Sequence, residues 1–208
     1  MPDLPISGLP QSSTLTGAEL FADVQGGITK YTTLESIKNY VTGSTPGLGG
    51  TGMGWARYDD TQYTTSSFLT VVDGAAAVVI PNNAGNTVTT YINSVLPFYD
   101  GSTKKIQMEN SGDVYSMIVT FRAKAPNANQ THMDITLAST GATPYERVSK
   151  SLVFSKGNNE WENFYESFHF YADPDFVING NQFKIDAVGG NVDIASAIYF
   201  IQRTFNAG

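Results

Sequence analysis

Residues 55–208 alternate between apolar and polar side chains with a period of two, the pattern of half-buried β-strands. In DVYSMIVTFRAKA the apolar residues at every second position from Tyr115 to Phe121 share one face, and Ser116, Thr120 and Arg122 share the other. The segments HMDITLAST, ENFYESFHFYAD and NQFKIDAVGG repeat the alternation. The side chains predicted to point inward are Met133, Ile135, Leu137, Phe164, Phe168, Phe170, Phe183, Ile185 and Ala187.

The last strand pattern, VDIASAIYFIQRTF, is apolar on both faces over part of its length. This suggests a strand buried between the core of its own sheet and a neighbouring subunit. Further short patterns, separated by turn sequences such as DG, NNAGN and KGNN, bring the total to about eight to ten strands. Regularly spaced short strands without helical patterns between them predict an all-β sandwich, here an eight-stranded jelly roll.

The hydrophobic period stops in TGSTPGLGGTGMG, residues 42–54, whose glycine and small polar residues are typical of a flexible linker. The sequence therefore predicts three parts: an arm over residues 1–41, the linker over residues 42–54 and the body over residues 55–208.

The arm has too few apolar residues to bury a core of its own. Prolines at positions 2, 5 and 10 favour an extended start. Gly26-Gly27 between LFADVQ and ITKYT predicts a tight hairpin. Thr32 and Glu35 then form a capping-box pattern, which predicts a short helix that is marginal alone in water. We expect the sparse apolar residues to dock on a larger assembly: Leu4, Ile6, Leu9, Leu15, Leu20, Phe21, Val24, Leu34 and Ile37.

Composition narrows the range of functions. The net charge is -7, which disfavours nucleic-acid binding because that affinity depends on Lys and Arg. The chain has no cysteine, so disulfides and thiolate metal sites are excluded. Residues 1–13 lack the features of a signal peptide, and no window approaches the roughly 20 apolar residues of a membrane span. We expect a protein made in a cytoplasm and not inserted in a membrane.

Candidates for chemistry are few, and each has a plainer interpretation. His132 and Asp134 share a strand face, which is compatible with a metal or a general base, but no third ligand has a motif spacing. The pairs Asp59-Asp60 and Asp173-Pro174-Asp175 could serve glycoside hydrolysis or calcium binding, but DPD is also typical of turns. We expect no catalytic residue, no metal site and no cofactor.

Outward-facing aromatic residues are the stronger candidates for binding. Aromatic faces stack on sugar rings, and exposed apolar patches also mark subunit interfaces. The interface interpretation is favoured, and the glycan interpretation is retained as the alternative. The candidates for either role are Trp161, Tyr165, Tyr171 and Tyr199.

The arm resembles an N-terminal module of structural proteins of tailed bacteriophages, including fibre-like and head-decorating ones. The resemblance covers about forty residues. It is carried by Leu9-Pro10, by LTGAE from Leu15, by VQGGIT followed by Thr32-Thr33, and by the short segment ending at Tyr40. In the body, WARYDDTQYT, IPNNAG, VTFRAKAPNAN and YFIQRT are similar to trimeric phage fibre-head or capsid-decoration domains with a jelly roll of the tumour-necrosis-factor type.

The resemblance implies a non-enzymatic virion protein. We expect a homotrimeric spike that decorates or cements the capsid surface and is attached through its N-terminal arm to the major capsid protein or to a tail or baseplate protein. The alternative is a tail fibre or receptor-binding tip that recognises host-surface polysaccharide. A polysaccharide depolymerase using Asp or Glu is the enzymatic rival.

Overall fold

The computed structural model describes residues 20–25, 28–33, 53–92, 96–142 and 146–207. The chain divides into two compact units, residues 1–50 and 51–208, which are described separately. The arm and linker boundaries proposed above at residues 41 and 54 stay predictions. The first strand of the second unit begins at Gly54.

The first unit contains the hairpin expected for the arm. Strand β1 (Leu20–Gln25) pairs antiparallel with β2 (Ile28–Thr33), and the register runs from Leu20 opposite Thr33 to Gln25 opposite Ile28. This register leaves a two-residue loop, so the hairpin prediction is confirmed. The short helix predicted after it, with Leu34 and Ile37, lies outside the described residues, as do Leu4, Ile6, Leu9 and Leu15.

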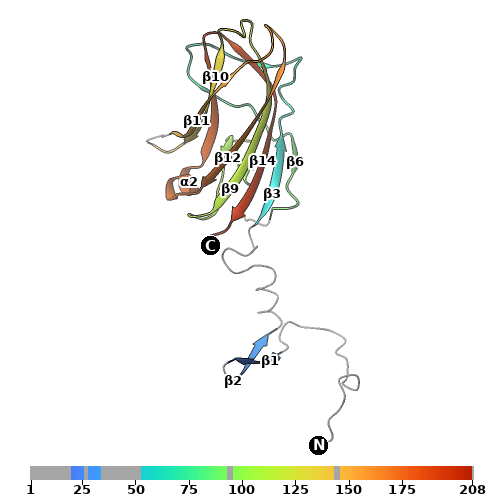
Figure 1. Cartoon of the computed structure of the whole chain (residues 1–208), viewed down its shortest axis with the longest axis vertical. Coiled ribbons are helices and arrows are strands. Elements are labelled where there is room, and N and C mark those ends of the chain that lie inside the picture. The colour runs from blue at the N-terminus through green and yellow to red at the C-terminus, as the bar shows by residue number, and fades with distance from the viewer. Residues whose placement is uncertain (1–19, 26–27, 34–52, 93–95, 143–145, 208) are drawn as a thin grey trace, which may run out of the picture. The chain divides into compact units, whose positions relative to one another are not determined.

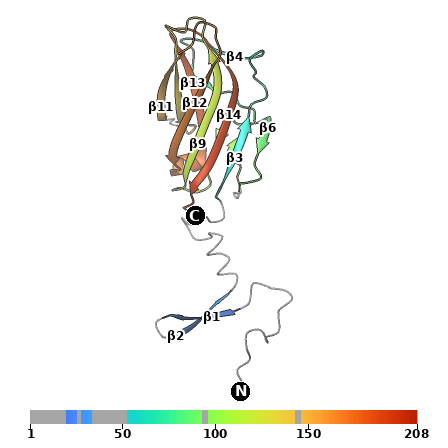
Figure 2. The ribbon, with the colours of Figure 1, turned by 45° about the vertical axis from the view of Figure 1, so that its right-hand side comes forward.

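The second unit consists of two antiparallel sheets (Figures 1 and 2). One has the order β12-β9-β14-β3-β6, with β4 also paired to β14, and the other has the order β11-β10-β13-β8-β7, with β5 paired to β13. The bounds in chain order are β3 Gly54–Asp59, β4 Leu69–Val71, β5 Val78–Val79, β6 Asn86–Val88, β7 Tyr99–Asp100, β8 Lys105–Ile106, β9 Val114–Lys124, β10 His132–Ser139, β11 Glu146–Val153, β12 Glu162–Tyr171, β13 Asn181–Val188 and β14 Val192–Phe205.

The order of the strands is that of a jelly roll. Strand β10 pairs with β11, β9 with β12, β8 with β13, and β3 with β14, so the chain is a long antiparallel ribbon folded onto itself. Rolling this ribbon places β9, β12, β14 and β3 in one sheet and β8, β10, β11 and β13 in the other. The predicted all-β jelly-roll sandwich is therefore confirmed.

The core lies between the two sheets and follows the predicted alternation. Strand β9 alternates strictly between buried and partly exposed residues, and the predicted inward residues of β10, β12 and β13 are all buried. Aromatic rings fill much of the space, for example Tyr99 edge-on to Tyr199 at a centroid distance of 4.9 Å. A core of this size explains how the second unit folds without disulfides.

The sequence pattern missed one helix. The DPD segment was expected to be a turn, but it begins α2 (Pro174–Asn179). The expected capping does occur, because the side chain of Asp173 accepts a hydrogen bond from the backbone N–H of Phe176 at 2.8 Å. Proline at the first helical position fits this start. The helix turns the chain from β12 in one sheet to β13 in the other.

Segments far apart in the sequence meet at the end of β3. The backbone N–H of Asp60 donates to the carbonyl of Ala197 at 2.8 Å, and the Asp60 side chain accepts from the N–H groups of Tyr63 and Asn83 at 2.8 and 3.1 Å. Asp60 thus joins WARYDDTQYT to IPNNAG and to the last strand. Both members of the Asp59-Asp60 pair are therefore engaged in local contacts. Asp59 Oδ1 accepts a hydrogen bond from Arg57 Nε at 2.7 Å.

Candidate functional site

The outer face of the sheet β12-β9-β14-β3-β6, which points away from the other sheet, carries a row of aromatic rings. The Trp55 ring stacks between Tyr91, at a centroid distance of 4.7 Å, and Phe200, at 5.4 Å. Phe200 lies opposite Ile118 of β9 in the strand register. We call Tyr91, Trp55 and Phe200 the aromatic row.

The aromatic row is partly exposed although it lies beside the central strand of the sheet. Trp55, Phe200 and Ile118 are each partly exposed, and 58% of Tyr91 is exposed. Arg57 lies opposite Phe200 in the strand register, and its charge is paired with that of Asp59 on the same strand. Hydrogen bonding to Asp59 raises the pKa of Arg57. The outer face therefore has an apolar band without a net local charge at this point.

Trp161 belongs to a separate cluster within its own chain. Its ring meets Phe68 edge-on at a centroid distance of 5.8 Å, and Lys124 Nζ lies 4.5 Å from the centroid of Phe68 and 5.1 Å from that of Trp161. Cation–π contacts of this kind fix the ring in place. Trp161 thus holds the loop before β4 against β9.

Tyr165 and Tyr171 point outward from β12, as the alternation predicted. Their exposed fractions are 64% and 63%. They alternate with the buried residues Phe164, Phe168 and Phe170. Both side chains are accessible to a partner or a ligand.

Tyr199, the fourth aromatic candidate, is not accessible, so its proposed role at an interface or glycan site is wrong. It is 1% exposed and lies in the core, where its hydroxyl donates to the carbonyl of Ile80 at 3.1 Å. The strand was correctly predicted, but the phase was not: Tyr199 points inward, and Ile198 and Phe200 point outward. A strand with apolar residues on both faces does not reveal its phase by periodicity alone.

A pocket of about 350 Å³ lies between the edge strands of the two sheets, and we call it the edge pocket. It contains a bidentate ion pair, in which Arg147 Nη1 and Nη2 donate to the two Asp173 carboxylate oxygens at 2.5 and 2.8 Å. Arg147 Nε donates to Asn181 Oδ1 at 2.9 Å. The lining residues are Glu146, Arg147, Val148, His169, Phe170, Tyr171 and Asp173.

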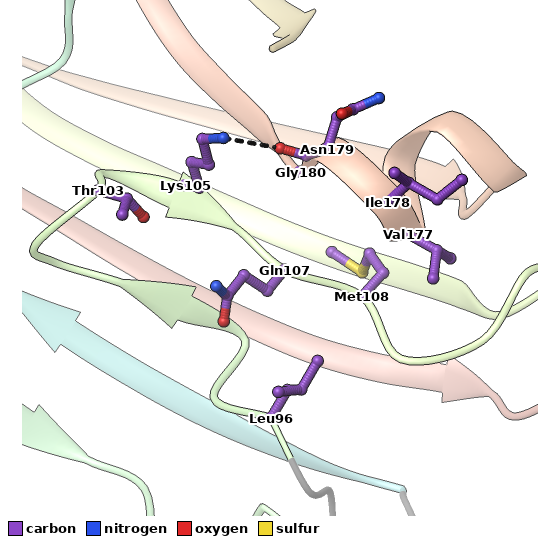
Figure 3. Close-up of a pocket in the computed structure, with 9 residues that line it drawn as sticks. All are labelled: Leu96, Thr103, Lys105, Gln107, Met108, Val177, Ile178, Asn179 and Gly180. Carbon is purple, nitrogen blue, oxygen red and sulfur yellow. Dashed lines mark hydrogen bonds between the residues drawn. The ribbon is translucent and has the colours of Figure 1, made fainter. Parts of the chain in front are cut away.

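A second hollow, of about 210 Å³, lies between α2 and β8 (Figure 3). Lys105 spans it and donates to the carbonyl of Asn179 at 3.0 Å. Ile178 on the helix is 78% exposed. The hollow is lined by Leu96, Thr103, Lys105, Gln107, Met108, Val177, Ile178, Asn179 and Gly180.

A buried charged cluster near the end of β14 was not predicted from the sequence. The Arg203 side chain is fully buried. Its Nε donates to the Tyr115 hydroxyl at 2.8 Å, and its Nη2 donates to Glu109 Oε2 at 2.6 Å. Asp113 Oδ2 lies 3.4 Å from Arg203 Nε. Desolvation opposes its charge, but Glu109, Tyr115 and Asp113 more than compensate and raise the pKa of Arg203. The YFIQRT pattern gave no sign that this arginine points inward. The cluster is structural.

His132 and Asp134 lie on one strand face, as expected, with His132 Nε2 3.9 Å from Asp134 Oδ1. Asp134 also accepts a hydrogen bond from Ser151 at 2.5 Å. Within the described ranges, no group of three or more His, Cys, Asp or Glu residues could hold a metal ion. Among the same residues, no helix is long and apolar enough to cross a membrane.

No protein-family model and no curated protein sequence matches this sequence. Among solved structures, it is similar to the Eiger TNF of S. frugiperda, at 11% identity over 73% of this chain and 92% of that one, with a TM-score of 0.47. It is also similar to the PRD1 vertex protein P5, at 11% identity over 94% of this chain and 86% of that one, with a TM-score of 0.37. A third similar structure is that of a carbohydrate-binding module from Cellvibrio mixtus lichenase 5A in complex with cellotriose. The identity is 12% over 69% of this chain and 94% of that one, with a TM-score of 0.32. The jelly-roll assignment rests on the strand pairing described above.

Proposed function

We propose that this chain is a structural protein of a tailed-bacteriophage virion: a homotrimeric spike that decorates or cements the capsid surface and is attached through residues 1–41. It acts by binding and has no catalytic role. The resemblance of the arm and body segments to phage structural proteins motivates the proposal.

One observation carries it, namely the partly exposed aromatic row on the outer face of the sheet β12-β9-β14-β3-β6. A contiguous group of exposed apolar side chains often marks an interface. Each copy carries a net charge of -7, which opposes association of copies, and an uncharged contact surface adds least to this repulsion. The aromatic row offers such a surface, with the Arg57–Asp59 pair already neutral beside it.

Three copies that meet through this face form a closed cyclic assembly. A closed ring buries the same band in every copy and leaves no free copy of it to drive further association. The central strand of the sheet, β14, then lies between its own core and a neighbour, as its sequence suggested.

The arm supplies the attachment. A two-stranded hairpin such as β1/β2 is at best marginally stable alone in water, so it needs a partner surface. The conformational entropy lost on ordering the hairpin is then offset by the contacts that form when it docks. Leu20, Phe21 and Val24 lie on β1 and are the described members of the proposed docking set.

The test is deletion of residues 1–41. The shortened protein is expected to remain a folded trimer, because residues 51–208 form a compact unit with a separate core. It should fail to add to particles that lack the native protein, whereas the full chain should add to them. Immunogold labelling then separates a capsid location from a tail location. Addition of the shortened protein to particles would refute attachment through the arm.

A further inference from the structure

We propose that the edge pocket binds a neutral saccharide. This inference concerns a ligand of the second unit and does not depend on the virion role or on the arm.

The pocket lies at the edge of the sandwich, and hydrogen bonds join the elements around it. Strand β11 is the edge of one sheet and β12 is the edge of the other, so the pocket lies where the sandwich is open. The bidentate Arg147–Asp173 pair and the bond from Arg147 to Asn181 tie β11 to the start of α2 and to β13. Its volume of about 350 Å³ is at the small end of the range of ligand sites. Little reorganisation is needed before a small ligand enters.

One wall is an exposed aromatic ring. Tyr171 is 63% exposed, and no other ring of the described residues packs against it. Sugar rings present C–H groups on their faces, and these carry partial positive charge that is attracted to the negative face of an aromatic ring. Phe170 points into the core behind it and stacks on Phe176 at a centroid distance of 5.4 Å, which fixes the backbone that carries Tyr171.

The polar side chains in the pocket are suited to hydroxyl groups. Glu146 and His169 are exposed, and neither side chain forms a hydrogen bond or ion pair within the described residues. The Glu146 carboxylate accepts hydrogen bonds from hydroxyls, and the His169 imidazole can donate or accept. Both groups are therefore available to a polyhydroxylated ligand that stacks on Tyr171.

The charge of the pocket selects against acidic sugars. Asp173 neutralises the charge of Arg147. A second carboxylate, that of Asp175, also lies close, with its Oδ2 3.4 Å from Arg147 Nη2. Glu146 adds a carboxylate without a cationic partner in the described residues. A ligand carboxylate would meet this negative charge, so a neutral saccharide is favoured over a uronic acid.

Tyr165 provides a matched control for Tyr171. Both tyrosines point outward from β12 and have nearly the same exposed fraction, but only Tyr171 lines the pocket. The full-length protein and its Tyr171→Ala, Glu146→Gln and Tyr165→Ala variants would be applied to an array of neutral glucose, galactose, mannose and N-acetylglucosamine oligomers and of oligogalacturonates. Hits would then be titrated by calorimetry.

The expected result is binding of at least one neutral oligomer, with no binding of the oligogalacturonates. Tyr171→Ala should weaken that binding about tenfold or more, as truncation of a central aromatic contact does, and Tyr165→Ala should leave it within about twofold. Glu146→Gln should weaken it by a smaller factor. Absence of binding to every neutral oligomer, or equal losses for the two tyrosine variants, would overturn the proposal. Preferential binding of oligogalacturonates would overturn its charge argument and with it the neutral ligand class.

Discussion

The rings of Trp55 and Phe200 stack at a centroid distance of 5.4 Å on the outer face of one sheet, although they come from the first and last long strands of the second unit. Strand pairing explains the contact, because β3 lies antiparallel to β14 and places Trp55 diagonally across from Phe200. The contact joins the two ends of the jelly roll in one apolar surface. This surface is the part of the proposed trimer that can be tested most directly.

Phe200→Glu is expected to convert the trimer to a monomer with its fold intact. The side chain points away from the core, so the charge disturbs the outer face and not the packing between the sheets. In the proposed interface each added carboxylate would have to be desolvated. Light scattering coupled to size exclusion measures the outcome as a fall to the mass of one chain, 22.4 kDa.

Ser149→Glu is the control for Phe200→Glu. It adds the same charge on an exposed residue of β11, in the other sheet. This variant should remain trimeric. A native protein that is already monomeric by light scattering, or a trimer that survives Phe200→Glu, would contradict the proposed interface.

The sequence was sufficient to predict the sandwich and most of its inward residues, because β9, β10, β12 and β13 alternate along most of their length and bury the side chains that the pattern places inward. Tyr199 shows where this fails. In AIYFI, from Ala197 to Ile201, neighbouring positions are all apolar, so two phases fit this segment, and the pairing of β14 with β3 and β9 decides between them. The edge pocket could not be predicted from the sequence for a different reason. Its two strands, β11 and β12, belong to different sheets, and their edges come together only when the ribbon rolls up.

Arg203→Met is expected to destabilise the second unit by about 3–5 kcal/mol, the usual cost of removing one partner of a buried ion pair. Its loss leaves the fully buried Asp113 and the partly exposed Glu109 without their cation. Urea unfolding followed by tryptophan fluorescence measures the change. In the control Arg57→Met, the arginine side chain is 47% exposed, and the cost should stay below about 1 kcal/mol although its ion-pair distance is similar. Equal costs would show that burial does not set the strength of these pairs.

Gly189→Ala is expected to destabilise the protein by more than about 3 kcal/mol, from backbone strain and a steric clash together. Gly189 has φ +82, and a Cβ there would lie 2.2 Å from the carbonyl oxygen of Gln130. Gly74 separates the two effects, because it has φ +71 with open space around it. Gly74→Ala should cost only about 1 kcal/mol, the strain alone. Thermal unfolding of the two variants measures the difference, and similar losses would rule out the clash.

Stability is expected to fall steeply at alkaline pH because of four buried tyrosines. Burial raises the pKa of Tyr58, Tyr99, Tyr115 and Tyr199 above the ordinary value of 10.0. Above that value the unfolded chain releases tyrosine protons that the folded chain retains, so the unfolded state is favoured as pH rises. Each tyrosine contributes a loss of about 1.4 kcal/mol per pH unit until its folded-state pKa is reached. At neutral pH all four are protonated in both states, and the effect is absent.

Tyr199→Phe isolates one of these contributions. The variant should be less stable at neutral pH by about 1–3 kcal/mol, because the carbonyl of Ile80 loses its hydrogen-bond donor. Above about pH 10, however, its free energy of unfolding should fall less steeply than that of the native protein, by a difference in slope that approaches one proton. Urea titrations at several pH values give this slope directly. A variant with the native slope would mean that Tyr199 ionises equally in the folded and unfolded chains, which full burial of its hydroxyl between the two sheets does not allow.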